Sequence, residues 1–107
     1  MAKWVKIGPI DGLSEGGHVC LTAEDSGVIV CKLDGELFAA ANVCPHAHMP
    51  IGEGELRGSV LTCPFHGYAF DVKTGRNVDF ADDLPLCTFP IRTTEDGRVE
   101  VDIEKAP

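Results

Sequence analysis

Two short motifs in the middle of the chain carry the residues best suited to chemistry. The first is a C-x-H sequence that starts at Cys44 and ends at His46, and the second is a C-x-x-H sequence from Cys63 to His66. Each motif offers one thiolate and one imidazole. Sixteen residues separate His46 from Cys63, enough for a hairpin that brings both motifs to one point. We therefore predict a metal centre held by Cys44, His46, Cys63 and His66.

Two kinds of metal centre use this mixture of ligands. Finger-type zinc sites usually place cysteine with cysteine and histidine with histidine. Here each motif holds one of each, so we favour a [2Fe–2S] cluster. One iron would take Cys44 and Cys63, and the other would take His46 and His66. A third alternative is that the four residues are ordinary core side chains. Their regular spacing beside glycines and prolines argues against it. An absorption spectrum separates the iron–sulfur and zinc alternatives.

The two motifs, with Gly67 directly after the second, resemble the ligand loops of the Rieske family. Strand-like runs on both sides extend the resemblance over nearly the whole chain. The chain is similar to the Rieske-type ferredoxins of multicomponent ring-hydroxylating dioxygenase systems, which act on aromatic compounds. The resemblance implies one [2Fe–2S] cluster. It also implies a single all-β domain of antiparallel sheets over residues 1–107, with a cluster-binding subdomain inserted at about residues 43–80.

The resemblance implies an electron carrier without a catalytic site of its own. Such a ferredoxin takes single electrons from an NAD(P)H-dependent flavoprotein reductase and passes them to a terminal oxygenase. An oxygenase would need a mononuclear iron with two histidines and a carboxylate, and the cluster leaves only His18 and His48 of the four histidines. The alternative is a non-catalytic small subunit of the nitrite reductase type. Such subunits typically lack the ligands, whereas all four are present here.

The resemblance also bears on the reduction potential. Rieske proteins of cytochrome bc complexes carry a disulfide between the ligand loops, and the matching positions here are Met49 and Phe65. Those proteins also have a serine and a tyrosine whose hydroxyls donate to sulfur, where this chain has Tyr68 and Phe70. With fewer donors the reduced cluster is less stabilised. We therefore expect a potential at the low end of the roughly −150 to +300 mV Rieske range.

Charge and composition narrow the partners and the compartment. The formal net charge of −8 over 107 residues argues against nucleic acid and anionic membranes, and favours a partner with a basic face. Simple solubility explains the charge equally well. The chain shows no long apolar run and no secretory signal, so we expect a cytoplasmic protein. In that reducing compartment Cys20, Cys31 and Cys87 are expected to be small buried thiols.

Strand signals recur along the chain and helix signals are weak. The clearest local feature is Asp34-Gly35, a type I′ turn signal between the apolar run 28–33 and residues 36–40. Residues 52–59 are rich in turn formers, and Pro90 suggests a sheet edge or a bulge. The other expected strands cover residues 4–7, 17–21, 60–62, 68–71, 86–92 and 98–103. Evenly spaced short strands predict an all-β sandwich or small barrel.

Short ligand loops should leave the two imidazoles at the tip of the subdomain, where partners dock. His48, beside the first motif, is interpreted as a surface residue rather than a ligand. Leu84-Pro85-Leu86 resembles the proline-containing loop that covers the cluster in Rieske proteins. The expected apolar docking residues are His48, Met49, Pro50, Phe65 and Tyr68, and the expected acidic rim is Glu53, Glu55, Asp82 and Asp83.

Overall fold

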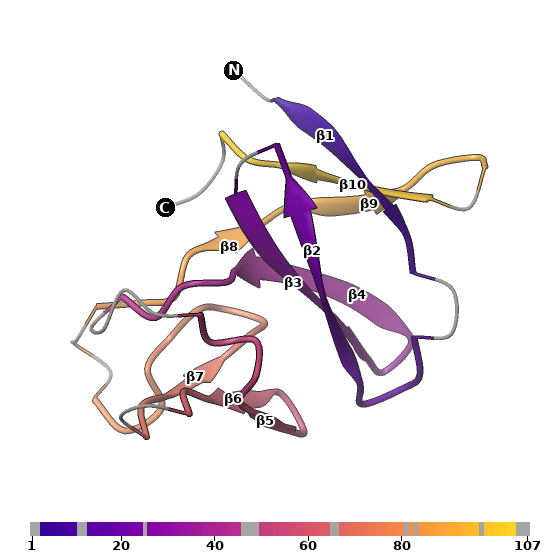
Figure 1. The fold of residues 1–107 in the computed structure, drawn as a ribbon. Coiled ribbons are helices and arrows are strands. Elements are labelled where there is room, and N and C mark those ends of the chain that lie inside the picture. Colours follow the sequence, from indigo (N-terminus) through magenta and orange to yellow (C-terminus); the bar gives the residue numbers. More distant parts are fainter. Residues whose placement is uncertain are drawn as a thin grey trace.

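The computed structural model of the 107-residue chain describes residues 3–10, 13–24, 26–45, 50–64, 67–80, 82, 84–96 and 98–104. These residues form ten strands in three antiparallel sheets (Figure 1). The strands are β1 (Trp4–Pro9), β2 (His18–Ala23), β3 (Ser26–Leu33), β4 (Glu36–Ala41), β5 (Glu55–Arg57), β6 (Val60–Thr62), β7 (Ala69–Asp71), β8 (Thr88–Phe89), β9 (Ile91–Thr93) and β10 (Arg98–Asp102). The predicted all-β fold is confirmed. In the part of the chain described, no helix has the length and apolar character needed to cross a membrane.

The central sheet has the strand order β2-β3-β4-β8. Its β3–β4 hairpin closes with Leu33 opposite Glu36, and Asp34 and Gly35 in the turn have φ angles of +55° and +78°. Two consecutive positive φ angles define a type I′ turn, whose twist matches that of the flanking strands. The turn predicted from the Asp-Gly pair is therefore confirmed.

Strand β3 is apolar on both faces because the central sheet is covered on both sides. Val28 and Val30 belong to one buried cluster together with Val99 of β10, and neither valine is exposed to solvent. Ile29 and Cys31 alternate with them and belong to a second buried cluster on the other face. Side chains on a strand alternate between faces, so one continuous apolar run builds both cores.

The outer sheet has the order β1-β10-β9 and is linked to the central sheet through Pro90. The single strand expected over residues 86–92 is in fact two strands that belong to different sheets. Phe89 of β8 pairs with Ala39 of β4, whereas Ile91 of β9 pairs with Val101 of β10. Proline has no N–H to give to a ladder, so pairing stops at Pro90 and the chain crosses from one sheet to the other.

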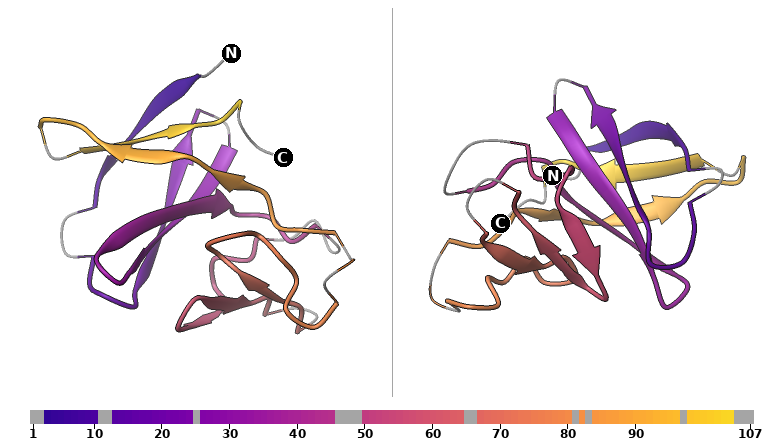
Figure 2. Two further views of the ribbon diagram at one scale, coloured as in Figure 1. Left: turned by 180° about the vertical axis from the view of Figure 1, so that it is seen from behind. Right: turned by 60° about the horizontal axis from the view of Figure 1, so that its bottom comes forward.

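The small third sheet, β5-β6-β7, lies to one side of the other two (Figures 1 and 2). Its middle strand places Leu61 opposite Leu56 of β5 and Phe70 of β7. Residues 52–59, which are rich in turn formers, nevertheless include strand β5, because Leu56 faces an apolar partner across the ladder. The boundaries 43–80 of an inserted subdomain remain a prediction.

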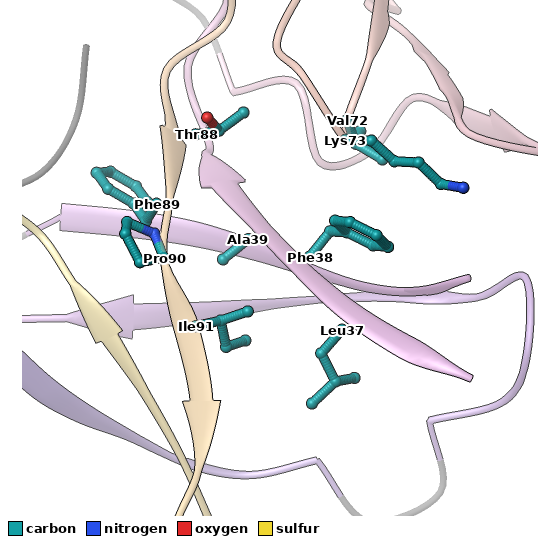
Figure 3. Close-up of a pocket in the computed structure, with 9 residues that line it drawn as sticks. All are labelled: Leu37, Phe38, Ala39, Val72, Lys73, Thr88, Phe89, Pro90 and Ile91. Atoms are coloured by element: carbon teal, nitrogen blue, oxygen red, sulfur yellow. The ribbon is translucent and has the colours of Figure 1, made fainter. Parts of the chain in front are cut away.

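A groove of about 550 Å³ separates the chain after β7 from strands β4, β8 and β9 (Figure 3). Lys73 lies beside Phe38 of β4 at this groove, with its Nζ atom 5.5 Å from the ring centroid. The same ammonium group lies 3.4 Å from a carboxylate oxygen of Asp34. A cation near a ring face is attracted by the ring quadrupole, so Lys73 ties the small sheet to the β3–β4 hairpin.

Candidate metal centre

Cys44 lies just beyond the end of β4 and is fully buried, with no side-chain surface exposed. The chain that leads to it is fixed by backbone hydrogen bonds. The Ala41 N–H donates to the Cys87 carbonyl at 2.8 Å, and the Asn42 N–H donates to the Gly27 carbonyl at 3.0 Å. The central sheet therefore determines where the first predicted ligand lies.

Cys63 begins the loop between β6 and β7 and is 1% exposed. Its N–H donates to the Tyr68 carbonyl at 2.6 Å, and its carbonyl accepts from the Gly67 N–H at 3.1 Å. Gly67 has a φ angle of +74°, in the left-handed region that costs other residues energy. The glycine after the second motif is thus explained by the tight closure of this loop.

The two cysteines come from different loops into one apolar cluster and neither forms a disulfide. Ile51, Leu61, Phe70 and Leu86 belong to the same cluster, and none of these four side chains is exposed. Two free thiols held out of water in one apolar cluster are a suitable donor pair for an iron of a [2Fe–2S] centre. The residues described therefore fit the cluster.

The structure does not describe the histidine half of the predicted ligand set. His46 and His66 are outside the described residues, and so are His48, Met49, Phe65 and Asp83. Within the part of the chain described, no three His, Cys, Asp or Glu side chains form a group that could hold a metal ion. The assignment of Cys44, His46, Cys63 and His66 as the four ligands remains a prediction.

The segment after the first ligand loop is held by residues that the motifs did not indicate. The Asn42 Oδ1 atom accepts hydrogen bonds from the Ile51 N–H at 2.9 Å and the Gly52 N–H at 2.7 Å. The Gly52 carbonyl lies 2.6 Å from Nε2 of His18 on β2. Asparagine next to a loop is a weak signal for such side-chain-to-backbone bonds. The His18 contact spans 34 positions and has no local signal.

Among the described residues, four large apolar side chains are exposed, one directly before Cys44 and three in the segment that follows β7. They are Val43, Val78, Phe80 and Leu84, between 41% and 60% exposed. Asn77 fixes the turn before Phe80 because its Oδ1 accepts from the N–H groups of Asp79 and Phe80, each at 3.0 Å. Within the expected proline-containing loop, Leu84 is exposed while Leu86 is buried beside the cysteines.

The expected acidic residues differ in their surroundings. The Glu53 and Asp82 side chains are exposed. Glu55 is also exposed, but its Oε1 lies 2.8 Å from Nε of Arg57. Part of the Glu55 charge is therefore neutralised by a neighbour on its own strand.

The three remaining cysteines do not share one environment. Cys31 is 1% exposed in the middle of β3, and burial, with a smaller contribution from Cys20, raises its thiol pKa to about 12. It is a core residue, as expected. Cys20 is exposed, so the expectation that it is buried was wrong, because β2 is the edge strand of the central sheet. Cys87 is partly buried.

The chain belongs to the Rieske [2Fe–2S] domain family, because the model of that family matches residues 3–90. It is 31% identical over 103 residues to the anthranilate 1,2-dioxygenase ferredoxin subunit of Burkholderia cepacia, covering 96% of this chain and 94% of that protein. In the solved complex of reduced oxygenase and oxidized ferredoxin in carbazole 1,9a-dioxygenase, one chain has a similar structure. It matches this chain with a TM-score of 0.80 and 29% identity, over 92% of both chains. A putative NADH-dependent nitrite reductase small subunit from Mycobacterium tuberculosis matches with a TM-score of 0.78 and 25% identity, over 94% of this chain and 95% of the other.

These findings define the class of protein. The chain carries one [2Fe–2S] cluster and is a Rieske-type ferredoxin similar to the ferredoxin components of aromatic dioxygenase systems. Those relatives are named as electron carriers rather than as the catalytic enzymes of their systems, and the expectation of a carrier is confirmed.

Proposed function

We propose that this protein is the ferredoxin component of an aromatic-ring-hydroxylating dioxygenase system in the cytoplasm. It carries single electrons from an NAD(P)H-dependent flavoprotein reductase to the Rieske centre of a terminal oxygenase. The observation that carries the proposal is the nearly end-to-end match to a dioxygenase ferredoxin subunit, over 96% of this chain and 94% of that protein.

The protein's own residues suit this role. Cys44 and Cys63 would hold one iron, and His46 and His66 the other; the cluster, when bound, accepts and releases one electron at a time. Cys44 and Cys63 are 0% and 1% exposed, so the apolar cluster keeps water from the thiolate side. We therefore propose that electrons pass through the imidazole side, which the sequence predicts at the tip of the two loops.

Exposed apolar side chains near the ligand motifs in the sequence suit a partner that binds briefly. Val43 directly precedes Cys44, and Phe80 is 60% exposed in the segment that leads towards the buried Leu86. Exposed apolar side chains of this size are characteristic of interaction sites when they gather in one region. Electron-transfer interfaces are small and weak, because turnover requires release. We propose that these residues contribute to the docking surface for both the reductase and the oxygenase.

The second candidate is a small subunit of a nitrite reductase. The structural likeness to such a subunit, with a TM-score of 0.78, favours it. The four predicted ligands count against it, because subunits of this type typically lack them. The two functions predict different partners for the same fold.

The test uses the purified full chain under anaerobic conditions. Dithionite reduction should give the electron paramagnetic resonance (EPR) spectrum of a mixed-ligand [2Fe–2S] cluster. The reduced protein should then support product formation by the oxygenase component of anthranilate 1,2-dioxygenase, with a Cys63→Ala protein as the inactive control. A protein without a cluster would contradict the proposal. A protein that instead restores activity to a nitrite reductase large subunit, and not to the oxygenase, would establish the second candidate.

A further inference from the structure

We propose that Asn42 and His18 act as a clamp that closes the base of the first ligand loop, residues 43–50, and so positions Cys44 at the cluster. The proposal deepens the proposed function and rests on it in one respect, namely that Cys44 is a cluster ligand. Neither residue belongs to the ligand motifs, so both are positioning residues.

Asn42 closes the loop through a single oxygen atom. Its Oδ1 accepts from the N–H of Ile51 at 2.9 Å and from that of Gly52 at 2.7 Å. An amide oxygen has two lone pairs and can satisfy two backbone donors at once. Asn42 is itself held to the central sheet, because its N–H donates to the carbonyl of Gly27 at 3.0 Å. The two ends of the ligand loop are therefore fastened at one residue.

His18 fastens the same point from another strand. Its Nε2 lies 2.6 Å from the Gly52 carbonyl oxygen. A carbonyl only accepts hydrogen bonds, so Nε2 must carry the hydrogen. His18 stands on β2 opposite Cys31 of β3, which means that the base of the loop is tied to two neighbouring strands of the central sheet.

Gly52 fits between these side chains only because it has no Cβ atom. A Cβ there would lie 2.3 Å from the Cys20 Sγ and 3.1 Å from the Asn42 Oδ1. Real Cβ atoms do not approach other atoms so closely. The Gly52 peptide therefore packs closely against the central sheet, at the position where the clamp bonds it.

The clamped segment also contacts the second ligand loop. The Gly54 N–H donates to the Ile51 carbonyl at 2.9 Å. A Cβ at Gly54 would lie 1.8 Å from the carbonyl oxygen of Thr62, the residue directly before Cys63. The chain from Ile51 to Gly54 thus passes from the base of one ligand loop to the base of the other. By holding Ile51 and Gly52, the clamp fixes the position of the first ligand loop relative to the second.

Loss of the clamp should be felt at the cluster. Removing the Asn42 oxygen would leave two backbone N–H groups without their partner, which favours opening of the loop. An open loop samples more conformations, and Cys44 would then be held less firmly. Replacement of residues that orient metal ligands commonly weakens metal binding 10- to 100-fold. Faster cluster loss and a broadened cluster spectrum are the expected signs.

The test compares paired variants of the holoprotein. Asn42→Asp keeps an oxygen acceptor at the same position, whereas Asn42→Leu has the same shape without one. His18→Gln keeps an N–H donor, whereas His18→Leu removes it. Val99→Ala, in the other buried cluster, is the control for a general loss of stability. The readouts are the rate of iron loss to a chelator, the EPR spectrum of the reduced protein and the thermal midpoint.

The proposal predicts that Asn42→Leu loses its cluster about tenfold or more faster than wild type, with an altered EPR spectrum. Asn42→Asp and His18→Gln should stay close to wild type, and Val99→Ala should lower the thermal midpoint with an unchanged spectrum. The inference is overturned if the leucine variants keep the wild-type spectrum and loss rate, or if cluster loss follows the thermal midpoint in every variant, Val99→Ala included. A wild-type chain that binds no cluster would overturn the proposed function as well, so the two failures are distinct.

Discussion

Cys44 and Cys63 lie in the same buried apolar cluster although they belong to two different loops, one after β4 and one between β6 and β7. Both thiols are free, and their exposed fractions are 0% and 1%. Because water is kept from both sulfur atoms, a metal bound there would exchange ligands slowly with solvent. A cluster bound by these cysteines should therefore survive purification, so its loss in a variant can be measured.

The first prediction concerns assembly of the cluster. Replacing any of Cys44, His46, Cys63 or His66 with alanine should abolish the native [2Fe–2S] cluster, because each residue is assigned as a ligand. Iron and acid-labile sulfide analysis of the purified variants measures this.

The matched control for assembly is His48→Ala, which should retain the cluster. A protein that loses its cluster in His48→Ala but keeps it in His46→Ala would show that the first motif is C-x-x-x-H rather than C-x-H. The histidine assignment would then have to be changed.

The second prediction concerns the reduction potential, which we expect below about 0 mV by protein-film voltammetry. Phe70 is fully buried in the cluster that holds both cysteines. Phe70→Tyr should raise the potential, because a hydroxyl that donates to a thiolate sulfur stabilises the more negative reduced state. A neutral hydrogen bond of ordinary strength corresponds to about 20–65 mV for one electron.

Phe70→Leu is the control for this substitution, since it changes the packing without adding a donor. It should leave the potential within about 20 mV of wild type. An equal rise in both variants would mean that packing, and not the hydroxyl, sets the potential at this position.

The third prediction concerns the turn between β9 and β10. The hydrogen bond from the Thr94 hydroxyl, followed by that from the Arg98 N–H, lowers the pKa of the Asp96 carboxyl from 3.8 to about 2. A lowered pKa favours folding above the unfolded-state pKa, near pH 3.8, and this contribution is lost as the pH falls through about 2. Thr94→Val should therefore raise the Asp96 pKa towards 3.8 in an NMR titration.

The comparison variant for Asp96 is Lys6→Met. Lys6 Nζ lies 3.4 Å from the Asp96 carboxylate, and its hydrogen bond and its charge each lower the pKa less than the Thr94 hydrogen bond does. The rise in Lys6→Met should therefore be smaller than in Thr94→Val. The reverse order would show that the ion pair, rather than the hydroxyl, controls this carboxylate.

Local features of the sequence predicted local structure well. The Asp34-Gly35 pair predicted its turn because few residues adopt two consecutive positive φ angles. The apolar run 28–33 predicted a strand, and its burial on both faces became visible only in the structure. Pro90 was harder to interpret, since a proline within a strand pattern shows that pairing stops but not that the two halves join different sheets.

The site was predictable only in part, because some of its residues act through contacts between distant segments of the chain. Cys44 and Cys63 were found because cysteine and histidine types at fixed spacing report their own chemistry. His18 was not found, because a side chain bonded to a backbone group 34 positions away leaves no pattern in the sequence. Asn42, which bonds groups 9 and 10 positions away, was not found because an asparagine beside a loop is only a weak signal. Cys20 was placed in the core from its apolar neighbours, but the edge position of β2 was not visible without the sheet order.

The last prediction concerns electrostatic steering of partners. With a net charge of −8, reduction by a partner with a basic face should slow as salt rises, because screening lowers the association rate. Glu53 is exposed and no ion pair involves it among the described residues, whereas Glu55 is 2.8 Å from the Arg57 guanidinium. Glu53→Gln should therefore lower the second-order rate constant at low salt by about two- to fivefold. Glu55→Gln should have a smaller effect, because part of its charge is already neutralised.

Stopped-flow reduction across ionic strength, with Asp82→Asn and Asp83→Asn included, measures the salt dependence and the effect of each substitution on the rate constant. A rate constant that responds neither to salt nor to these variants would show that docking is not steered and that the acidic charge serves solubility alone.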